Sequence, residues 1–352
     1  MMKIIHCADV HLGSKMEAKL PKNKAEERRI EVRKTFQNMV EYAKMEGVRA
    51  IILAGDVFDS DRPFKRDKEF FYEVVKATPE IDFLYLRGNH DGKESYVEDG
   101  IDNLKTFQES WTSYDYDEVR ISGIEIGPAN ALSLYATLSL EEHRKNIVVL
   151  HGQTGSVSGV DKINLNKLVD KNIDYLALGH IHSFEENKLD DRGRYAYSGC
   201  LEGRGFDECG EKGFVLLEIE EQIHSRFVPF AKRKIQERFV DISATNNRYE
   251  AYLRSKEKVE NAKDLYRLIL IGEVAYESDG LAEEIAQMLD GACYFVNVKN
   301  KTTQKLYARD YEGDTSLRGE FVRKVLQKDW SEEKKYRVLQ MGLKALSRRE
   351  VD

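Results

Sequence analysis

The sequence is poor in cysteine and proline and has no long hydrophobic run. Its 352 residues include only four cysteines, and none of them forms a Cys-x-x-Cys pair, which argues against a zinc knuckle and against a disulfide framework. The apolar run at the N-terminus is too short for the core of a signal peptide, and no later stretch is long enough to span a bilayer. Linkers rich in proline or serine are also missing. We therefore expect a compact cytoplasmic protein with reduced thiols and no membrane association.

The charge balance is acidic, with a formal net charge of -7. Because contacts to phosphate groups need lysine and arginine, this balance disfavours strong binding of nucleic acid by the surface as a whole. Two stretches are nevertheless basic, residues 226–238 and residues 318–349. Each of them is either a local binding patch or an ordinary solvated face.

Short apolar runs alternate with longer amphipathic stretches from Lys3 to about residue 230, which is typical of strands separated by helices. A long helix is predicted over residues 24–46. Its predicted apolar face consists of Ile30, Phe36, Met39, Val40 and Ala43. The strands with the clearest pattern are residues 3–7, 50–54, 83–86, 147–150 and 175–178.

The pattern restarts on a smaller scale after about residue 233. Strand, helix, strand, helix and strand are predicted in turn over residues 235–242, 248–262, 265–271, 280–289 and 292–298. The tail reads as two amphipathic helices, with Thr315 or Ser316 as the first N-cap and Ser331 as the second. We therefore predict three parts: residues 1–232, 233–302 and 303–352.

Side chains that can bind a metal or move a proton follow each of the five clearest strands. One of these motifs alone, such as Gly-Asn-His-Asp at residues 88–91, could be a simple turn. Five of the eight histidines fall in this set, however, and that clustering favours a metal site. The set consists of Asp9, His11, Asp56, Asp59, Asn89, His90, Asp91, His151, His180 and His182.

The residue types indicate the kind of metal. Carboxylate and amide oxygens mixed with imidazole nitrogens suit Mn²⁺, Fe²⁺ or Zn²⁺, without the thiolates of a structural zinc site. Two such ions about 3.5 to 4 Å apart can hold a phosphate group, activate a water and stabilise the leaving oxygen. One carboxylate must then lie between them.

This ordered set of motifs resembles the calcineurin-like metallophosphoesterase superfamily, and the resemblance covers about residues 3–230. It implies an α/β (α+β) fold, a β-sandwich flanked by helices, with two divalent ions of which Mn²⁺ is favoured. It also implies that Asp56 bridges the ions, that His90 is the general acid and that Asp91 orients His90. One ion would be held by Asp9, His11 and His182, and the other by Asn89, His151 and His180.

The stretches "HCADVHLGS", "GDVFD" and "YSGCLEGRGFDECGEKGF" are similar to the SbcD-type DNA repair exonucleases. That resemblance implies a DNA exonuclease or endonuclease subunit in repair and recombination, with a small βαβαβ capping domain. It also implies C-terminal helices that bind an SbcC-like or Rad50-like ATPase, and it allows a homodimer. Archaeal and eukaryotic relatives usually carry a histidine at the position of Asp59, so Asp59 is given no role in rotating a nucleotide.

Three functions stay open from the sequence. The first is the DNA nuclease subunit, and the second is a phosphoesterase acting on small phosphodiesters, phosphomonoesters or proteins. The third, a scaffold without activity, is disfavoured because every expected ligand is present. The apolar stripes of the two end helices either bind the ATPase or pack on the capping domain. These stripes consist of Phe321, Val322, Val325 and Leu326, and of Tyr336, Leu339, Leu343 and Leu346.

Overall fold

The computed structural model describes residues 1–16, 20–92, 100–305, 311 and 313–346. The chain divides into two compact units, Met1–Ile235 and Gln236–Asp352. Within the described ranges, no helix is both long enough and apolar enough to cross a membrane.

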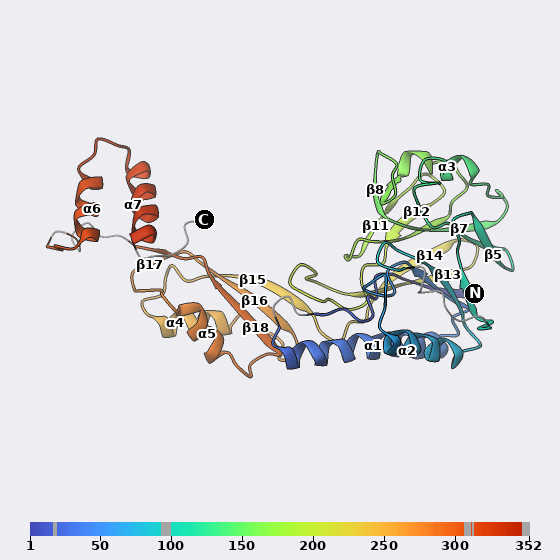
Figure 1. Ribbon diagram of the computed structural model, residues 1–352, viewed down its shortest axis with the longest axis horizontal. Helices are drawn as coiled ribbons and strands as arrows, with labels where there is room; N and C mark the ends of the chain where they lie inside the picture. The colour runs from blue at the N-terminus through green and yellow to red at the C-terminus, as the bar shows by residue number, and fades with distance from the viewer. Residues whose placement is uncertain (17–19, 93–99, 306–310, 312, 347–352) are drawn as a thin grey trace. The chain divides into compact units, whose positions relative to one another are not determined.

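The first unit is a sandwich of two six-stranded sheets (Figure 1). The strands of one sheet are, in spatial order, β14 (Ile223–Pro229), β13 (Gly213–Ile219), β1 (Met2–Cys7), β2 (Ala50–Ala54), β3 (Asp82–Leu86) and β4 (Leu104–Thr106). Those of the other sheet are β11 (Glu185–Lys188), β12 (Arg194–Tyr197), β10 (Tyr175–Gly179), β7 (Lys145–His151), β6 (Val119–Gly123) and β5 (Thr112–Tyr116). A separate two-stranded parallel sheet pairs β8 (Gln153–Gly155) with β9 (Lys162–Asn164). The predicted mixed α/β sandwich is confirmed.

The central strands β2, β3 and β10 are buried at every position, because both of their faces are covered. On β1, Ile4 points into the core between the sheets, whereas Ile5 faces the opposite way. Helices α1 (Lys22–Met45) and α2 (Lys65–Lys76) cover that outer face with Phe36 and Phe71. The outer face of the second sheet is covered in part by the short helix α3 (Leu134–Thr137).

The buried face of α1 differs from the predicted one. Ile30 is 63% exposed, so its assignment to the apolar face is wrong. Arg28 is buried instead, and its guanidinium contacts Glu31 at 2.6 Å and Glu202 at 2.8 Å. Its charge is tolerated in the core because two carboxylates and the carbonyl of Gly203 satisfy its donors. Hydrophobic periodicity cannot detect a buried residue of this kind.

The five clearest predicted strands are β1, β2, β3, β7 and β10. In the first sheet β1, β2 and β3 run parallel to one another, and in the second sheet β7 runs parallel to β10. The ends of parallel strands meet at one edge of a sheet, which is where ligands bind in α/β proteins. The motifs that follow these strands are therefore brought together at the two edges.

The second unit contains the predicted βαβαβ arrangement. Its three-stranded sheet has the order β15 (Ile235–Asp241), β16 (Leu265–Ile271) and β18 (Phe295–Asn300). Helices α4 (Arg248–Lys256) and α5 (Leu281–Met288) follow β15 and β16, and both contribute to the core of this unit. Two short strands, β17 (Glu273–Val274) and β19 (Thr303–Gln304), pair separately.

The predicted end helices are α6 (Leu317–Leu326) and α7 (Glu332–Leu346). Of the two predicted N-caps for α6, Ser316 is the one whose side chain accepts a hydrogen bond from Gly319 N–H. The apolar stripes of the helices pack mainly against each other, which neither alternative from the sequence described. The residues buried between them are Val322, Val325, Leu339 and Leu343. Residues 306–310, 312 and 347–352 of the predicted C-terminal segment lie outside the described residues.

Candidate metal centre

The structure brings all seven predicted metal ligands into one connected cluster. Asp9 and His11 follow β1, Asp56 follows β2, Asn89 follows β3, and His151 ends β7. His180 and His182 follow β10. Contacts between neighbouring side chains in this cluster are 3.0 to 4.0 Å long.

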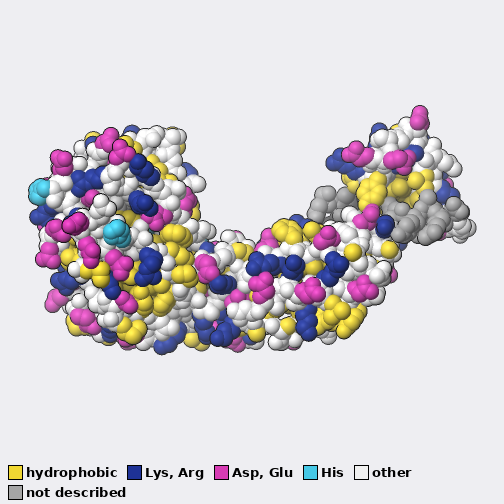
Figure 2. Space-filling view, turned by 180° about the vertical axis from the view of Figure 1, so that it is seen from behind, with side chains coloured by type: hydrophobic (Ala, Val, Ile, Leu, Met, Phe, Trp, Pro, Cys, Tyr) yellow, Lys and Arg dark blue, Asp and Glu magenta, His cyan; other side chains and the backbone are white. Residues whose placement is uncertain are grey.

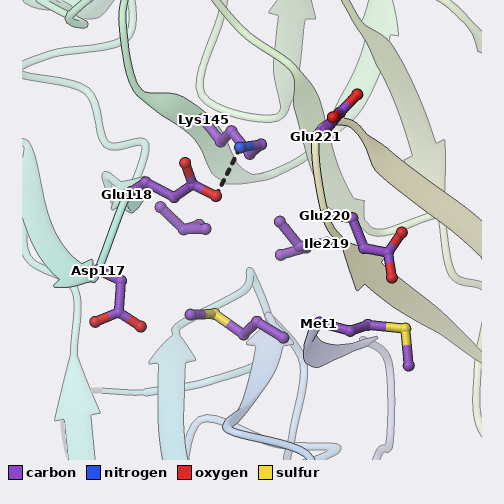
Figure 3. A pocket seen from close by; sticks show the side chains of 9 residues that line it. Met1, Asp117, Glu118, Lys145, Ile219, Glu220 and Glu221 are labelled. Atoms are coloured by element: carbon purple, nitrogen blue, oxygen red, sulfur yellow. Dashed lines mark ion pairs between the residues drawn. The ribbon is translucent and has the colours of Figure 1, made fainter.

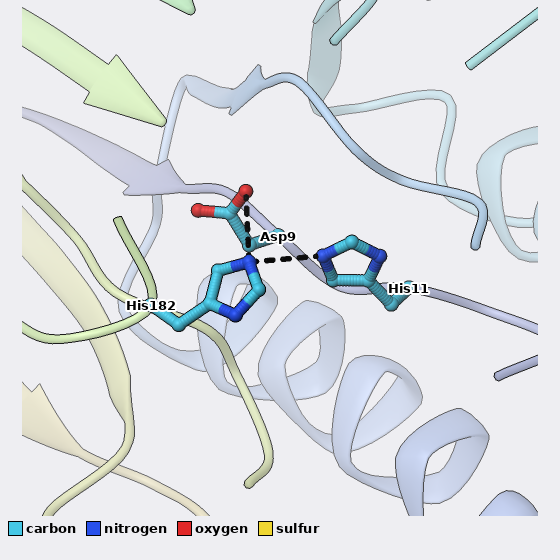
Figure 4. Close-up of side chains that lie close together, drawn as sticks. All are labelled: Asp9, His11 and His182. Carbon is cyan, nitrogen blue, oxygen red and sulfur yellow. Dashed lines mark hydrogen bonds and ion pairs between the residues drawn. The ribbon is translucent and has the colours of Figure 1, made fainter. Parts of the chain in front are cut away.

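One half of the cluster consists of Asp9, His11 and His182 (Figure 4). The Nε2 atoms of the two histidines face each other at 3.2 Å, and His182 Nε2 lies 3.9 Å from Asp9 Oδ1. The Nδ1 atoms face carboxylates, those of Asp59 at 3.2 Å and Glu208 at 2.7 Å. Glu208 is closer to His182 Nδ1 than the Arg204 guanidinium at 3.2 Å, so the carboxylate accepts the Nδ1 proton and Nε2 presents a lone pair. The ion-pair distance between His11 Nδ1 and Asp59 favours the same tautomer for His11.

Two facing lone pairs repel each other unless a cation lies between them. Two imidazole nitrogens bound at 2.0–2.1 Å and at right angles to one ion are about 3 Å apart. The 3.2 Å separation of the two Nε2 atoms fits that arrangement. The donor set of this half therefore fits a divalent ion.

The other half of the cluster shows the same pattern. His151 Nδ1 donates to the carbonyl of Ala54 at 2.9 Å, so in the neutral ring the lone pair is on Nε2. That lone pair faces two further acceptors, Asn89 Oδ1 at 3.0 Å and Asp56 Oδ2 at 3.4 Å. His180 Nδ1 also lies 3.0 Å from Asn89 Oδ1. Acceptors converge here as well, so this half also fits a cation.

The electrostatics of the second half point the same way. Burial on its own lowers the pKa of His151, but the Asp56 carboxylate outweighs this effect and raises the pKa to about 9. Burial would raise the pKa of Asp56, whereas His151 and His11 hold it well below its usual range. The acidic groups therefore draw a positive charge to this position, as a metal-binding site does.

Two carboxylates lie between the halves. Asp9 belongs both to the group with His11 and His182 and to a group with Asp56 and His151, and each group could close on one ion. Asp56 Oδ2 lies 4.0 Å from His11 Nε2 and 3.4 Å from His151 Nε2. Asp9 also accepts the backbone N–H of His180 at 3.0 Å. The sequence assigned only Asp56 to the position between the sites.

Backbone strain is concentrated at the ligands. Eight non-glycine residues in the described ranges have a positive φ, and four of them are predicted ligands. Such angles cost free energy and mark functional sites when the surrounding fold enforces them. The four strained ligands are Asp9, His11, Asp56 and His180.

Glycine makes the close approach of the loops possible. Gly55 has φ +96°, and a Cβ there would lie 2.1 Å from His151 Nδ1. A Cβ on Gly88 would lie 2.2 Å from Asp56 Oδ1. Both glycines are therefore required for the ligand-bearing loops to pack together.

His90 lies at the exposed edge of the cluster, with its ring centroid 5.1 Å from that of His11. Its Nδ1 is 3.3 Å from the backbone carbonyl of Asp59, and its backbone N–H donates to Asp56 Oδ1 at 2.8 Å. The imidazole is thus tethered beside the first half of the cluster but remains open to solvent. This placement is compatible with proton transfer to a group bound there.

Asp91 does not orient His90, contrary to what the resemblance implied. Its carboxylate accepts the backbone N–H groups of Val57, Phe58 and Gly88 at 2.9 to 3.2 Å. It therefore ties the loop after β3 to the loop after β2. Burial, with a further contribution from the charge of Asp56, raises the pKa of Asp91 to about 7.

Two residues around the first half, Arg204 and Glu208, were not predicted, and Asp59 was predicted to lie at the site but was given no role there. Asp59 and Glu208 face the two histidines, and Arg204 contacts both carboxylates. Burial would raise the pKa of Glu208, but His182 and Arg204 hold it well below its usual range. The only signal in the sequence was the stretch "YSGCLEGRGFDECGEKGF", whose likeness to known nucleases carried no residue roles.

Two hollows border the sandwich in different places. One of about 300 Å³ adjoins the second half of the cluster and is lined by Asn89 and His151 together with Arg87, Glu125 and Asp161. A larger one of about 540 Å³ lies where β1 and β7 begin, at the strand ends away from the ligands (Figure 3). It is lined by several acidic side chains, and its Lys145 is paired with Glu118 at 2.7 Å. The hollow next to the cluster is the one relevant to a substrate.

Comparison with known proteins agrees with this geometry. Residues 2–184 match the family model of the calcineurin-like phosphoesterases. The chain is 25% identical over 327 residues to the DNA double-strand break repair protein Mre11 of Sulfurisphaera tokodaii, covering 86% of this chain and 82% of that protein. It is also 25% identical to Mre11 of Sulfolobus acidocaldarius, over 85% and 82% of the two chains.

Among solved structures, a dimetal phosphatase from Danio rerio is similar with a TM-score of 0.45 and 12% identity, covering 62% of this chain and 93% of that one. The resemblance to the SbcD type is confirmed by the similarity to Mre11, its homologue. The family match spans more than half of the chain and includes most of the ligand-bearing strands. The chain belongs to the calcineurin-like phosphoesterase family and is a two-metal hydrolase of phosphoester bonds.

Proposed function

We propose that this protein is a manganese-dependent DNA nuclease, with exonuclease or endonuclease activity, that acts in DNA repair. The observation that carries the proposal is the similarity to Mre11, which extends over 86% of the chain and so beyond the phosphoesterase match. Those relatives are named as DNA double-strand break repair proteins. In this role the protein works in the cytoplasm with DNA as its substrate.

The residues of the cluster take the following roles in the proposal. One ion would be held by Asp9, His11 and His182 and the other by Asn89, His151 and His180, and Asp56 would contribute its carboxylate to both. When bound, the ions supply charge stabilisation to the phosphate group and make a water nucleophilic. The donors mix oxygen with imidazole nitrogen and include no thiolate, which suits Mn²⁺ as well as Fe²⁺ and Zn²⁺, and the resemblance favours Mn²⁺ among them.

His90 is the proposed general acid. Its imidazole is exposed at the edge of the cluster, and its Nδ1 faces the carbonyl of Asp59. A carbonyl accepts a hydrogen bond, so the contact places a proton on Nδ1 and turns Nε2 away from Asp59. When the ring is protonated, Nε2–H can donate to the leaving oxygen of a phosphodiester.

A small phosphodiester is the second candidate substrate, and the charges near the cluster favour it. Arg87 is ion-paired with Glu125, and Arg204 is paired with Asp59 and Glu208. On the face shown in Figure 2, basic and acidic side chains are interspersed, which does not make a continuous track for a phosphate backbone. Together with the net charge of -7, this makes a partner part of the proposal for DNA binding.

The two candidates are separated by one pair of assays. Protein loaded with Mn²⁺ is given end-labelled linear DNA and, separately, bis(p-nitrophenyl) phosphate, with and without a purified SbcC-like or Rad50-like ATPase. The proposal expects cleavage of DNA that disappears in EDTA and in Asp56→Asn. Turnover of the small diester without any cleavage of DNA, with or without the ATPase, would establish the second candidate instead.

The proposed partner is an SbcC-like or Rad50-like ATPase that binds the α6–α7 hairpin. The helices leave apolar side chains partly exposed, at Leu317 (68%), Tyr336 (41%) and Met341 (53%), and the Tyr336 hydroxyl donates to Glu273 Oε1 at 2.6 Å. Basic residues such as Arg318 and Arg337 lie beside two of them. An apolar surface with a basic border suits an acidic protein partner.

Truncation after Gly313 tests the docking role. Because the hairpin has its own small core, the remaining chain should keep its melting temperature and its hydrolysis of a small diester. Co-purification with the ATPase should be lost. A control with Leu317→Ser, Tyr336→Ser and Met341→Ser keeps the hairpin core and should also lose the partner. Full-strength binding by the truncated chain would exclude this surface.

A further inference from the structure

Arg204 lies between two carboxylates that each face a histidine of the first half of the metal cluster. Its Nη1 is 2.7 Å from Asp59 Oδ1, and its Nη2 is 2.6 Å from Glu208 Oε1. Asp59 in turn faces His11 Nδ1 at 3.2 Å, and Glu208 faces His182 Nδ1 at 2.7 Å. One guanidinium thus completes a continuous chain of contacts from one histidine to the other.

The shape of arginine suits this position. The planar guanidinium presents donors in fixed and different directions, so one group can hold two carboxylates in a defined relation. Nη1 donates a hydrogen bond to Asp59, whereas Nε and Nη2 both donate to Glu208. The backbone N–H of Arg204 also donates to Glu208 Oε2 at 2.7 Å, which fixes the local loop. The ammonium group of a lysine could form a close ion pair with only one of these two carboxylates.

The segment 200–212, which contains Arg204, also holds the backbone of His182. The carbonyl of His182 accepts from Lys212 Nζ at 2.6 Å and from the backbone N–H of Cys200 at 3.3 Å. Lys212 is only 3% exposed, so this contact is made in the interior. His182 is therefore held at its carbonyl by both ends of the segment 200–212 and at its ring by Glu208.

The second half of the cluster is supported differently. His151 Nδ1 donates to a backbone carbonyl, that of Ala54, and Asn89 has no charged group behind it among its described contacts. Within the described part of the chain, the hydrogen bonds and ion pairs of Arg204 go to Asp59, His182 and Glu208. Substitution of Arg204 should therefore alter metal binding by the half with His11 and His182 and leave metal binding by the other half unchanged.

We infer that Arg204 is a positioning residue that joins the two histidines of the Asp9–His11–His182 site through Asp59 and Glu208. It sets the affinity of that site for its divalent ion independently of the neighbouring site. This inference rests on the two-metal assignment made above. It also gives Asp59 a role in supporting a metal ligand, His11, rather than in contacting the substrate.

The test is a titration of apoprotein with Mn²⁺, followed by calorimetry and metal analysis, without an activity assay. Removing a partner behind a metal ligand commonly lowers metal affinity about 10- to 100-fold. Arg204→Met should weaken one of the two sites by that factor and leave the other unchanged. Arg204→Lys should restore only part of the loss, because one ammonium group cannot hold both carboxylates.

Two backgrounds identify which site is affected. In His182→Asn, which already lacks the first site, Arg204→Met should leave the remaining affinity unchanged. In His151→Asn, it should weaken the remaining site. The opposite pattern, or an equal effect in both backgrounds, would overturn the inference.

Arg233→Met is the matched control. The side chain of Arg233 is 14% exposed, against 18% for Arg204, and it likewise makes a paired contact with a glutamate, Glu31. It touches no metal ligand among its described contacts. Loss of metal affinity in both variants would show general loosening of the fold and would overturn the inference.

The remaining outcomes are also decisive. If Arg204→Met does not fold, Asp59→Asn and Glu208→Gln test the inference instead. Each should weaken binding of Mn²⁺ at the Asp9–His11–His182 site alone. Unchanged affinity in both would overturn the inference. Wild-type protein that binds fewer than two ions would contradict the two-metal assignment itself, which is a separate failure.

Discussion

The Tyr175 hydroxyl donates a hydrogen bond of 2.9 Å to His6 Nδ1 and so joins β10 of one sheet to β1 of the other. His6 Nε2 donates to the carbonyl of Leu178 at 3.2 Å, which fixes the tautomer, since a carbonyl can only accept. His6 is completely buried. The contact links β1 and β10, one strand from each sheet. Asp9 follows β1, and His180 follows β10.

His6 should make the fold sensitive to acid. Burial lowers the pKa of His6 to about 3, from an ordinary value of 6.5. Between these two values the unfolded chain takes up a proton that the folded chain refuses, so the free energy of unfolding falls as the pH falls from 6.5 towards 3. Above pH 6.5 this contribution is fully present.

The variant His6→Leu separates this effect from other titrations. At pH 7 it should be less stable by about 1 to 3 kcal/mol, because Tyr175 and the Leu178 carbonyl lose their buried partner. Between pH 6.5 and 4 its stability should fall less steeply than that of the wild type. Urea unfolding in EDTA measures both quantities. Parallel pH dependences would contradict a neutral buried His6.

His90→Asn should keep both ions and lose activity. The imidazole of His90 lies at the exposed edge of the cluster and is not one of its converging ligands. Loss of a positioned general acid commonly costs about 10² to 10⁴ in rate. Metal analysis checks that both ions are kept, and turnover of a small phosphodiester checks the loss of activity. Depletion of metal in this variant would show that His90 is a ligand.

The ligands could be predicted from the sequence because they directly follow apolar strands. A ligand such as Asp56 comes after five buried residues of β2, and parallel strands bring such positions to one edge. The order of the motifs along the chain was therefore enough to predict that these ligands lie close together. Strands β5 and β6 were not predicted, because sequences such as Thr-Ser-Tyr-Asp-Tyr have too little apolar character to stand out.

Residues that act through other side chains could not be predicted in this way. Arg204 and Glu208 lie in a loop without regular spacing. Their partners outside this loop are more than 20 residues away along the chain, in His182 and farther still in Asp59. Asp91 shows the converse error. Its neighbour in sequence, His90, is not its partner in space, because its carboxylate is already taken up by three backbone N–H groups.

Asp56→Asn should deplete metal as well as activity. One Asp56 oxygen lies between His11 and His151, and the other accepts the backbone N–H of His90. The amide keeps the size of the side chain but removes the charge that attracts cations. Metal analysis after dialysis should show a loss at both sites. Full occupancy of both sites would refute a position of Asp56 between the ions.

Gly88→Ala should disturb the cluster without changing any ligand. A Cβ at this position would lie 2.2 Å from Asp56 Oδ1 and 2.6 Å from the Asp56 backbone nitrogen, so the loop that carries Asn89 must move away from the loop after β2. Shifts of this size between two ligand-bearing loops should lower metal affinity at least as much as loss of a supporting contact, about 10- to 100-fold. Gly127→Ala is the control, because Gly127 lines the same hollow and a Cβ there would meet nothing within 4 Å. Manganese titration and thermal unfolding of both variants check the prediction. If Gly88→Ala binds both ions as tightly as Gly127→Ala does, the close approach of these two loops does not determine metal affinity.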